Sequence, residues 1–576
     1  MLAITPIRSS ALKCDPKRRT HGVIKEPNGV ESMENRMDPR SVSWTVHAAD
    51  LISQGRVTLG IEFGSTRIKA CAVLPDGTPA VTGSHEWQNT LVDGHWSYSL
   101  EDVWAGVQDC FNDLVLNSER KFGVRPMSFL AIGISAMMHG YLAFAENGRQ
   151  LVPFRTWRDT YTGRAAATLT EKFGVNIPHR WSVAHYYEAI LDKEEHVPEV
   201  SFLTTLAGYV HWKLTGEKVL GVGDAAGMFP IDSETGDFNV TMLDTLTGLV
   251  AEHGVTVPFR QLLPDVLPAG RVAGELTEEG ALLLDTSGKL KSGIRFCPPE
   301  GDAGTGMVAT NAVRPRTGNV SVGTSIFAMI VMEGAVASHP EIDPVTTPEG
   351  HPVAMVHCNN GAQELSNWIE LFSEVALAFG KFKINSIDEV YGAILTEALH
   401  ADADGGGLLT YNFVSGEPVA GLKAGRPLLV RTPEANLSLA NFMRVQLYSA
   451  FATLAMGMQI LARDGVEVDA LYAHGGVFRT AGVAQRILAA ALDTPVGLAR
   501  SASEGGPWGI ALLALFLDAE EDSLADFLDH RIFTDAVVEL KAPEARDVAG
   551  FNIYLERFRR ALPLEDAAVS ALPIEN

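Results

Sequence analysis

The sequence predicts an α/β protein of two lobes, each built on a mixed sheet flanked by helices. Two glycine- and hydroxyl-rich turns, at residues 64–66 and 323–325, stand between β-type runs. Such turns offer backbone N–H groups to phosphate oxygens. The chain has 576 residues, whereas single cores stop growing at about 250 to 300 residues. These observations indicate two halves that close over one nucleotide.

The first half is predicted to begin with strands joined by tight turns. The Asp76-Gly77 pair is typical of a hairpin. A helix is expected over 100–116, with Ser99 as its N-cap and Asp102 in its first turn. The expected strands are 57–63, 67–74, 81–87 and 129–135. Hairpins followed by a helix and a further strand predict a mixed sheet with a helix packed on it.

The second half repeats this order of elements without a visible residue-level repeat. Residues 318–332 are predicted to form two strands around a Gly-Thr-Ser turn, and 442–462 a long apolar helix. A strand over 471–474 ends in two glycines, and a helix over 483–492 follows. A duplicated lobe with the ligand in the cleft between the copies is the simplest interpretation.

The charge of the chain limits its partners. A net charge of −24 and a pI near 5.1 argue against a nucleic-acid or membrane surface. An anionic nucleotide would then be held locally, by backbone donors and a metal ion. The cysteines are scattered without a C-x-x-C spacing, which predicts neither a zinc site nor a disulfide framework but a reducing cytoplasm. They are Cys14, Cys71, Cys110, Cys297 and Cys358.

No run approaches the roughly 18 to 20 apolar residues that a membrane span needs. The nearest, 447–461, contains Gln459 and is interpreted as a buried helix. Residues 1–55 are basic at their start and lack apolar periodicity, so we expect a poorly ordered extension. A basic transit segment, or a natural start at Met33 or Met37, are the alternatives.

Six motifs occur in the order found in the FGGY carbohydrate kinases, which belong to the actin, hexokinase and Hsp70 ATPase superfamily. The motifs are LGIEFGSTRIK (59–69), MHG (138–140) with WRD (157–159), GDAGTGM (301–307), GNVSVGTS (318–325), HGGVFRT (474–480) and EGGPWGIALLA (504–514). The chain thus resembles this family from Val57 to Ala514. The resemblance implies an N-terminal lobe over 56–310, a C-terminal lobe over 311–565 and a tail over 566–576.

The resemblance implies that Asp302 is the catalytic base. Phosphoryl transfer to a sugar hydroxyl needs a base near the alcohol, a metal spanning phosphate oxygens and donors on the developing charge. Asp302 stands in a glycine-rich loop, where small neighbours let a substrate approach the carboxylate. The alternative is an Asp that only satisfies turn amides.

The resemblance also implies a nucleotide site shared by both halves. Glu62 stands where the family usually carries an Asp that reaches Mg²⁺ through water. The longer side chain of Glu62 is expected either to fill the same role or to alter the geometry of the metal site. The glycines after 474 and 504 are expected to lie along the adenosine and the edge of the base. The implied nucleotide-binding residues are Gly64, Ser65, Thr66, Lys69, Gly323, Thr324, Ser325, Gly475, Gly476, Gly505, Gly506 and Gly509.

Sugar recognition is expected in the first lobe. His139 follows a strand end, where α/β sheets place ligands, and the resemblance implies that it donates to a sugar oxygen. The other implied sugar contacts are Met138, Trp157, Arg158 and Asp159. The usual W-x-D-x-R spacing is broken, because Tyr161 takes the Arg position and Arg164 comes later. Asp224 matches a segment near the hinge, in which Phe238 replaces the usual Trp.

The sequence therefore predicts an ATP- and Mg²⁺-dependent sugar kinase with a small-molecule sugar partner. A ketopentose, L-ribulose or D-xylulose, is the expected acceptor at its terminal hydroxyl; another ketose or a polyol is the alternative. The competing classes are an ATPase switch on the same fold and a catalytically silent sugar-binding relative. A homodimer is suggested by the resemblance alone. Residues 405–407 and 520–522 are interpreted as an ordinary turn and a solvated loop.

Overall fold

The structure, a computed structural model, describes residues 39–379, 387–498, 505–534 and 538–573. Contacts divide the chain into two units, residues 1–44 and 45–576. Helix α1 (Pro39–Ser53) spans this boundary, and every other described element belongs to the second unit. Residues 1–38 of the expected extension lie outside the described residues.

Two terminal segments are more regular than expected. Residues 39–53 form α1, whose side chains Ala48, Leu51 and Ile52 are buried at helical spacing. The expected tail likewise begins inside helix α17 (Pro563–Ala571). The apolar periodicity of residues 39–53 is short, and their helix differs from the poorly ordered extension expected there.

The first sheet has the strand order β13-β6-β1-β2-β3, and β14 extends it beside β6. Strands β1, β2 and β3 are antiparallel neighbours, whereas β6 runs parallel to β1. The bounds are β1 (Thr58–Phe63), β2 (Arg67–Val73), β3 (Pro79–Glu86), β6 (Ala131–Ala136), β13 (Arg295–Phe296) and β14 (Glu300–Gly301). The expected hairpins and the strand over 129–135 are confirmed.

The second sheet has the order β17-β18-β16-β15-β21-β22. Its hairpin β15–β16 and parallel neighbours β21 and β22 reproduce the arrangement of β1–β2 with β6 and β13. The bounds are β15 (Thr317–Val322), β16 (Ile326–Val331), β17 (Ile342–Thr346), β18 (Pro352–Cys358), β21 (Ala470–His474) and β22 (Val496–Leu498). The predicted duplication is therefore present as topology.

Helices cover both sheets. Helix α2 (Leu100–Phe122) packs on β3; the Ser99 side chain accepts from the Asp102 N–H at its start, as predicted. The longer helices near the first sheet are α3 (Gly163–Phe173), α4 (Ser182–Leu191), α5 (Leu206–Thr215), α7 (Val240–Ala251) and α9 (Asp302–Ala309). Those near the second are α10 (Gln363–Ala378), α11 (Ile387–Glu397), α12 (Leu439–Arg463), α13 (Val483–Leu492) and α16 (Ala545–Ala561).

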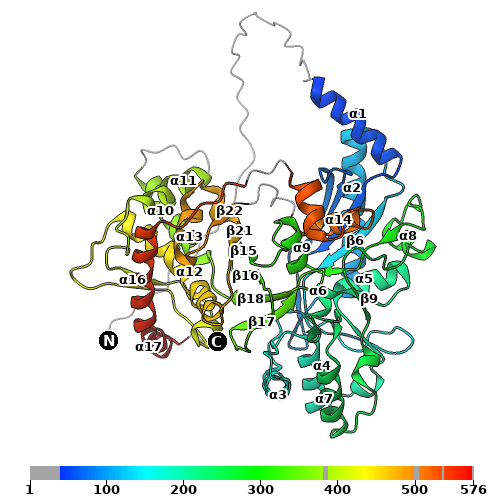
Figure 1. The fold of residues 1–576 in the computed structure, drawn as a ribbon, viewed down its shortest axis with the longest axis horizontal. Helices are drawn as coiled ribbons and strands as arrows, with labels where there is room; N and C mark the ends of the chain where they lie inside the picture. Colours follow the sequence, from blue (N-terminus) through cyan, green and yellow to red (C-terminus); the bar gives the residue numbers. More distant parts are fainter. Residues whose placement is uncertain (1–38, 380–386, 499–504, 535–537, 574–576) are drawn as a thin grey trace, which may run out of the picture. The chain divides into compact units, whose positions relative to one another are not determined.

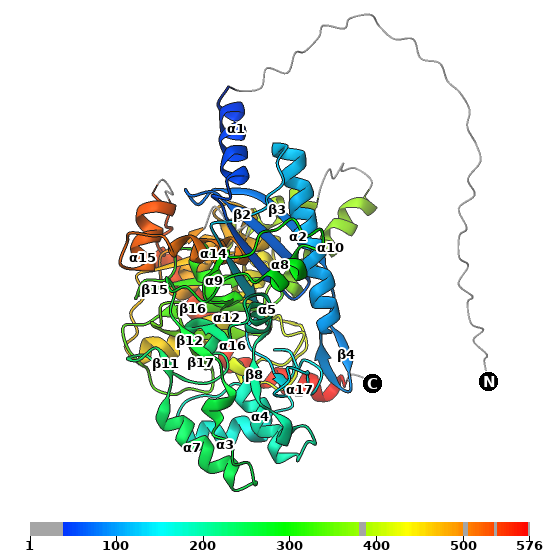
Figure 2. The same ribbon diagram turned by 90° about the vertical axis from the view of Figure 1, so that its right-hand side faces the viewer.

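Helix α14 (Gly505–Phe516) belongs with the first sheet, although it follows the second in sequence. It packs on β1, β6 and α9, and lies against α9 in both views (Figures 1 and 2). A Cβ on Gly60 would stand 2.0 Å from the Pro507 carbonyl oxygen, and one on Gly509 2.1 Å from that of Thr305. These glycines allow a close helix-to-sheet approach. Helix α14 thus packs on the first sheet, although it lies within the predicted C-terminal lobe over 311–565.

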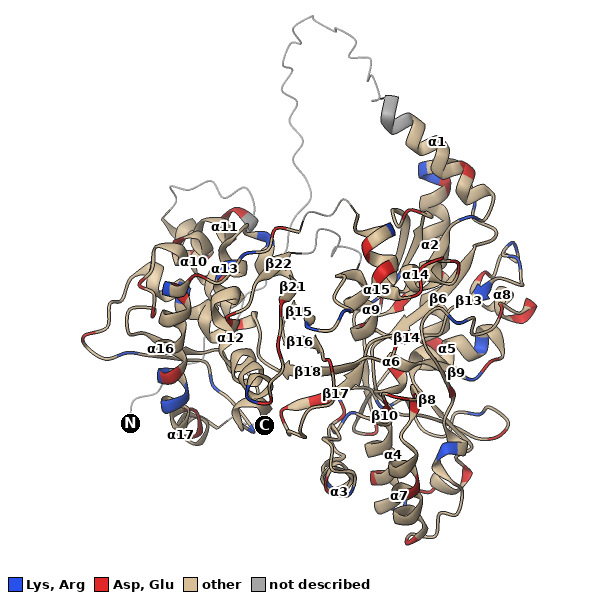
Figure 3. Ribbon diagram, viewed as in Figure 1, with Lys and Arg blue, Asp and Glu red and all other residues tan. Residues whose placement is uncertain are grey.

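Helix α12 is the one described helix that is long and apolar enough to cross a membrane. Its apolar window is 83% buried inside the fold, as expected for a core helix. Lys and Arg are scattered among Asp and Glu along the ribbon (Figure 3).

Candidate functional site

The first glycine turn connects β1 to β2. The Gly64 N–H donates to the Arg67 carbonyl at 3.0 Å, which closes the turn. Ser65 and Thr66 at its tip are exposed. Their N–H and hydroxyl groups are thus accessible to an anion.

Glu62 lies at the end of β1, directly before this turn. It is the cross-strand partner of Lys69, and Lys69 Nζ stands 3.6 Å from Glu62 Oε2. Burial raises the pKa of Glu62 to about 7, against the influence of Lys69, and the charge of Asp302 raises it further. Lys69, predicted to bind nucleotide, is therefore placed beside the predicted metal ligand.

Asp302 is the first residue of α9. Its Oδ1 accepts a hydrogen bond from the Met138 N–H at 3.1 Å, which joins the catalytic loop to the MHG element. Burial raises the pKa of Asp302 to about 6, whereas the backbone N–H groups of Met138 and Ala303 lower it. A carboxylate with this pKa is ionised at neutral pH and still basic enough to take a proton.

His139 has a strained backbone, with a φ of 72° that is uncommon for a residue with a side chain. It is buried, and its ring stacks on Trp181 with centroids 6.4 Å apart. Burial and the charge of Arg180 hold its pKa well below 6.5, so the ring is neutral. Nδ1 stands 3.3 Å from the Gly227 carbonyl and must be the donor there. In this tautomer Nε2 would accept a hydrogen bond, in contrast to the predicted donation from His139 to a sugar oxygen.

The WRD element is divided between a cleft and a buried contact. Trp157 and Arg158 line a cleft of about 950 Å³, together with Arg180, Asp343 and His357. Arg158 lies over the ring of Trp96 at 4.1 Å. Asp159 is buried instead, with Oδ2 2.9 Å from His95 Nδ1. The residues of this element thus have different surroundings.

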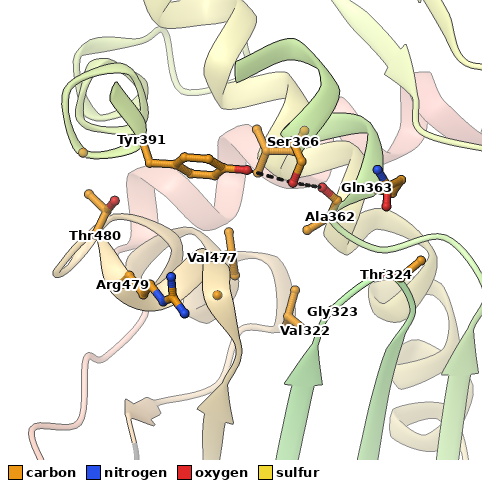
Figure 4. A pocket seen from close by; sticks show the side chains of 13 residues that line it. Val322, Gly323, Thr324, Ala362, Gln363, Ser366, Tyr391, Val477, Arg479 and Thr480 are labelled. Atoms are coloured by element: carbon orange, nitrogen blue, oxygen red, sulfur yellow. Dashed lines mark hydrogen bonds between the residues drawn. The ribbon is translucent and has the colours of Figure 1, made fainter. Parts of the chain in front are cut away.

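The second glycine turn borders a pocket of about 400 Å³ (Figure 4). Of the residues predicted for nucleotide binding, Gly323, Thr324 and Gly476 line it. Sequence reasoning missed its other polar lining residues, which are Gln363, Ser366, Tyr391, Arg479 and Thr480. Figure 4 shows the Tyr391 hydroxyl directed at Ser366, with 2.8 Å between their oxygens. The spacing of Gln363 and Ser366 on one turn of α10 is the signal that could have identified them.

The remaining predicted glycines lie elsewhere. Gly475, with a φ of 127°, allows the end of β21 to approach β15, because its Cβ would stand 2.0 Å from the Val322 carbonyl oxygen. Ser325 follows Thr324 in the second turn. Gly505, Gly506 and Gly509 begin α14, and a Cβ on Gly506 would stand 1.9 Å from Glu62 Oε1. Gly506 therefore lies beside Glu62 and Gly509 beside Thr305 of α9, and their predicted place along the edge of the base stays a prediction.

A second buried acidic pair, Asp224 and Glu300, lies beside Asp302. Asp224 Oδ2 accepts from Thr205 Oγ1 at 2.5 Å, and Glu300 Oε1 accepts from the Gly223 N–H at 3.3 Å. The other oxygen of each carboxyl has no partner among the described residues. Burial raises the pKa of Asp224 to about 7 and that of Glu300 well above its usual range. Both acids therefore favour their neutral forms in the folded protein.

Asp224→Asn is expected to remove a pH-dependent cost to folding. Since the folded-state pKa of Asp224 is raised from 3.8 to about 7, its stabilising contribution is complete below pH 3.8 and is lost as the pH rises through about 7. The Tm of the variant relative to the parent should therefore be higher at pH 8 than at pH 4. An equal difference in Tm at both pH values would contradict this.

Comparison with known proteins gives the same family for both halves. Residues 57–288 match the N-terminal domain and residues 318–517 the C-terminal domain of the FGGY family of carbohydrate kinases. A xylulose kinase of Haemophilus influenzae is 21% identical over 361 residues, 60% of this chain and 67% of that protein. A xylulose kinase of Staphylococcus xylosus is 18% identical over 79% of this chain and 90% of its own.

Solved structures show the same fold with different named substrates. A xylulose kinase from Brucella ovis superposes with a TM-score of 0.71 at 18% identity, covering 88% of this chain and 99% of its own. A gluconate kinase from Lactobacillus acidophilus has a TM-score of 0.70 at 16% identity, with 89% and 98% coverage. A glycerol kinase from Plasmodium falciparum has a TM-score of 0.67 at 15% identity, covering 90% of this chain and 99% of its own. At these identities the likeness concerns the fold alone.

Proposed function

The chain belongs to the FGGY family of carbohydrate kinases, and we propose that it transfers the γ-phosphoryl group of ATP to the terminal hydroxyl of a ketopentose, L-ribulose or D-xylulose. The observation that carries this proposal is the buried carboxylate of Asp302, fixed by the Met138 N–H and tuned to a pKa of about 6. The named relatives that are xylulose kinases support the sugar class.

The proposed reaction needs one proton transfer. The sugar hydroxyl gives its proton to Asp302 while its oxygen bonds to the γ-phosphorus, and the bond to the ADP oxygen breaks. His139, neutral and with Nε2 as acceptor, takes a hydrogen bond from a second sugar hydroxyl. Trp157 offers an apolar face to the sugar ring or chain. A ligand lacking the hydroxyl for His139 would leave that buried nitrogen unpaired, which provides discrimination.

The two glycine turns would hold the phosphates from opposite lobes. Ser65 and Thr66 serve the γ-phosphate, and Thr324 and Ser325 the other side. The carboxylate of Glu62 is a hard oxygen donor of the kind that Mg²⁺ uses together with phosphate oxygens. The described residues contain no cluster of three His, Cys, Asp or Glu side chains arranged around a metal. In the proposal Glu62 would hold Mg²⁺ through water, and the bound ion would supply neutralisation of charge on the phosphoryl group.

A coupled ADP-release assay with ATP, Mg²⁺ and a panel of sugars tests the proposal. The panel includes ketopentoses, other ketoses, aldonates and polyols, since relatives of the fold are named for gluconate and glycerol. Saturable turnover with highest kcat/KM on L-ribulose or D-xylulose is expected. Highest kcat/KM on an aldonate or polyol would replace the proposed acceptor while retaining the kinase.

The kcat/KM for the sugar is expected to fall at acid pH with a midpoint near 6. Asp302 acts only as the carboxylate, so activity is full above its pKa of about 6 and falls about tenfold per pH unit below it. Initial rates from pH 5 to 8 at saturating Mg²⁺ measure this. A rate independent of pH down to pH 5 would contradict the assignment of Asp302 as the base.

A cytoplasmic location and a homodimer are further parts of the proposal. Cys110, Cys297 and Cys358 are buried and outside any disulfide in the described part of the chain, which suits a reducing compartment. Light scattering after size-exclusion chromatography would give the oligomeric state. A mass near 62.0 kDa would contradict the dimer.

A further inference from the structure

All three carbonyl groups of the first glycine turn are held from outside the turn. Trp87 Nε1 donates to the Gly64 carbonyl at 2.7 Å, and the Trp87 backbone N–H donates to the Thr66 carbonyl at 3.2 Å. Tyr98 Oη donates to the Ser65 carbonyl at 2.6 Å. The rings of Trp87 and Tyr98 pack together with centroids 4.2 Å apart. We call Trp87 and Tyr98 the anchoring pair.

Both side chains of the anchoring pair act as hydrogen-bond donors to the turn. The indole N–H of Trp87 can only donate. Burial raises the pKa of Tyr98 to about 12, so its hydroxyl stays protonated at neutral pH. Trp87 and Tyr98 are 7% and 2% exposed, so water competes little for these hydrogen bonds.

Fixed carbonyls orient the N–H groups that follow them. In a trans peptide the C=O and the next N–H point in opposite directions. Holding the carbonyls of Gly64 and Ser65 therefore directs the N–H groups of Ser65 and Thr66 away from the anchoring pair. Ser65 and Thr66 are exposed, and within the described chain their N–H groups donate to no acceptor. The turn thus presents two oriented donors to an anion.

The second glycine turn is anchored in the same way by different groups. The Ala362 N–H donates to the Gly323 carbonyl at 2.8 Å, and the Gly361 N–H donates to the Thr324 carbonyl at 2.7 Å. The N–H groups of Thr324 and Ser325 are oriented by the same peptide geometry. Carbonyl anchoring therefore occurs in both turns, with backbone donors alone in the second and two side-chain donors and one backbone donor in the first.

The strand that carries Tyr98 into place is itself fixed to the sugar-side element. Strand β5 (His95–Ser97) ends just before Tyr98. His95 contacts Asp159, and the Trp96 carbonyl accepts from the Thr156 N–H at 3.0 Å. The segment that leads into Tyr98 is therefore joined to residues 156–159.

We propose that Trp87 and Tyr98 are positioning residues that set the first glycine turn in the orientation needed to bind the terminal phosphate of ATP. The inference rests on the proposed function, in which Ser65 and Thr66 serve the γ-phosphate. The two residues do not touch the reacting atoms. They act through the peptide groups of the turn, so their loss should change recognition of the terminal phosphate more than recognition of ADP.

Tyr98→Phe tests this with the loss of one oxygen atom, and Trp87→Phe removes the indole donor. Titration calorimetry without sugar measures the Kd of Mg²⁺·AMP-PNP and of Mg²⁺·ADP for the full chain. A loss of about 5- to 10-fold in AMP-PNP affinity is expected for each variant, as one hydrogen bond supplies. The ADP affinity should change less than twofold. Trp104→Phe is the matched control, because Trp104 Nε1 donates to Tyr209 Oη at 3.0 Å away from the turn.

The outcomes separate positioning from general support of the fold. A selective loss for AMP-PNP in Tyr98→Phe, absent from Trp104→Phe, supports the inference. Equal Kd values for AMP-PNP in the parent and in Tyr98→Phe would overturn it. Equal losses of affinity for AMP-PNP and ADP in Tyr98→Phe, together with a decrease in Tm as large as that of Trp104→Phe, would also overturn it. The titrations contain no sugar. If the ADP-release assay showed phosphorylation of none of the sugars, that result would count against the proposed acceptor and would leave the comparison of Kd values unchanged.

Discussion

Asp302→Asn is expected to lower kcat by about 10²- to 10⁴-fold, the range that general-base assistance supplies. The amide is nearly the same size as the carboxyl and can still accept from the Met138 N–H, so the loop should keep its position. It cannot accept the hydroxyl proton. The Kd of Mg²⁺·AMP-PNP should remain within about threefold of the parent value, because the glycine turns are unchanged. Steady-state kinetics and calorimetry measure the two effects.

Asp285→Asn is a matched control for this substitution. Asp285 is also buried, but its carboxylate accepts from Arg125 and Ser287 and stands outside both pockets. Its loss should lower Tm and leave kcat close to the parent value. Full turnover in Asp302→Asn would show that the base is another group. The same loss in both variants would show that the effect is on folding.

Local sequence signals were sufficient for most strands and helices. Ser99 and the acidic first turn fixed the start of α2, and the Asp76-Gly77 pair marked the turn between β2 and β3. The docking of α14 on the first sheet was not predictable in this way. It depends on two glycines that are far apart in sequence. Gly60 has no side chain to keep α14 from β1, and Gly509 has none to keep α14 from Thr305 of α9.

The residues of the candidate site also differ in whether the sequence alone could identify them. The glycine turns and the loop of Asp302 are continuous motifs, so their place in the sequence identified them. The contacts of His95 with Asp159, and of Tyr98 with Ser65, join residues without a motif and form only on folding. The contact of His139 with the Gly227 carbonyl, 88 residues away, is likewise not marked by any motif.

Gly506→Ala is expected to lower kcat/KM by about 10- to 100-fold, because a misplacement near 1 Å at a catalytic group has effects of this size. The new Cβ would stand 1.9 Å from Glu62 Oε1 and 2.6 Å from its Cδ, and its three nearest neighbours are all Glu62 atoms. The carboxylate must therefore move from its place between Lys69 and the glycine turn. Glu62→Asp shortens the side chain by one methylene and leaves room for the methyl group.

The double variant Glu62→Asp with Gly506→Ala should accordingly recover kcat/KM to within about threefold of Glu62→Asp alone, a coupling expected of residues in direct contact. Gly248→Ala in α7 is the control for helical Gly-to-Ala substitution, because no heavy atom lies within 4 Å of its Cβ position. It should leave kinetics unchanged. Additive losses in the double variant would show that Gly506 is needed for the backbone of α14. Recovery would show that the glycine in α14 accommodates the glutamate of β1.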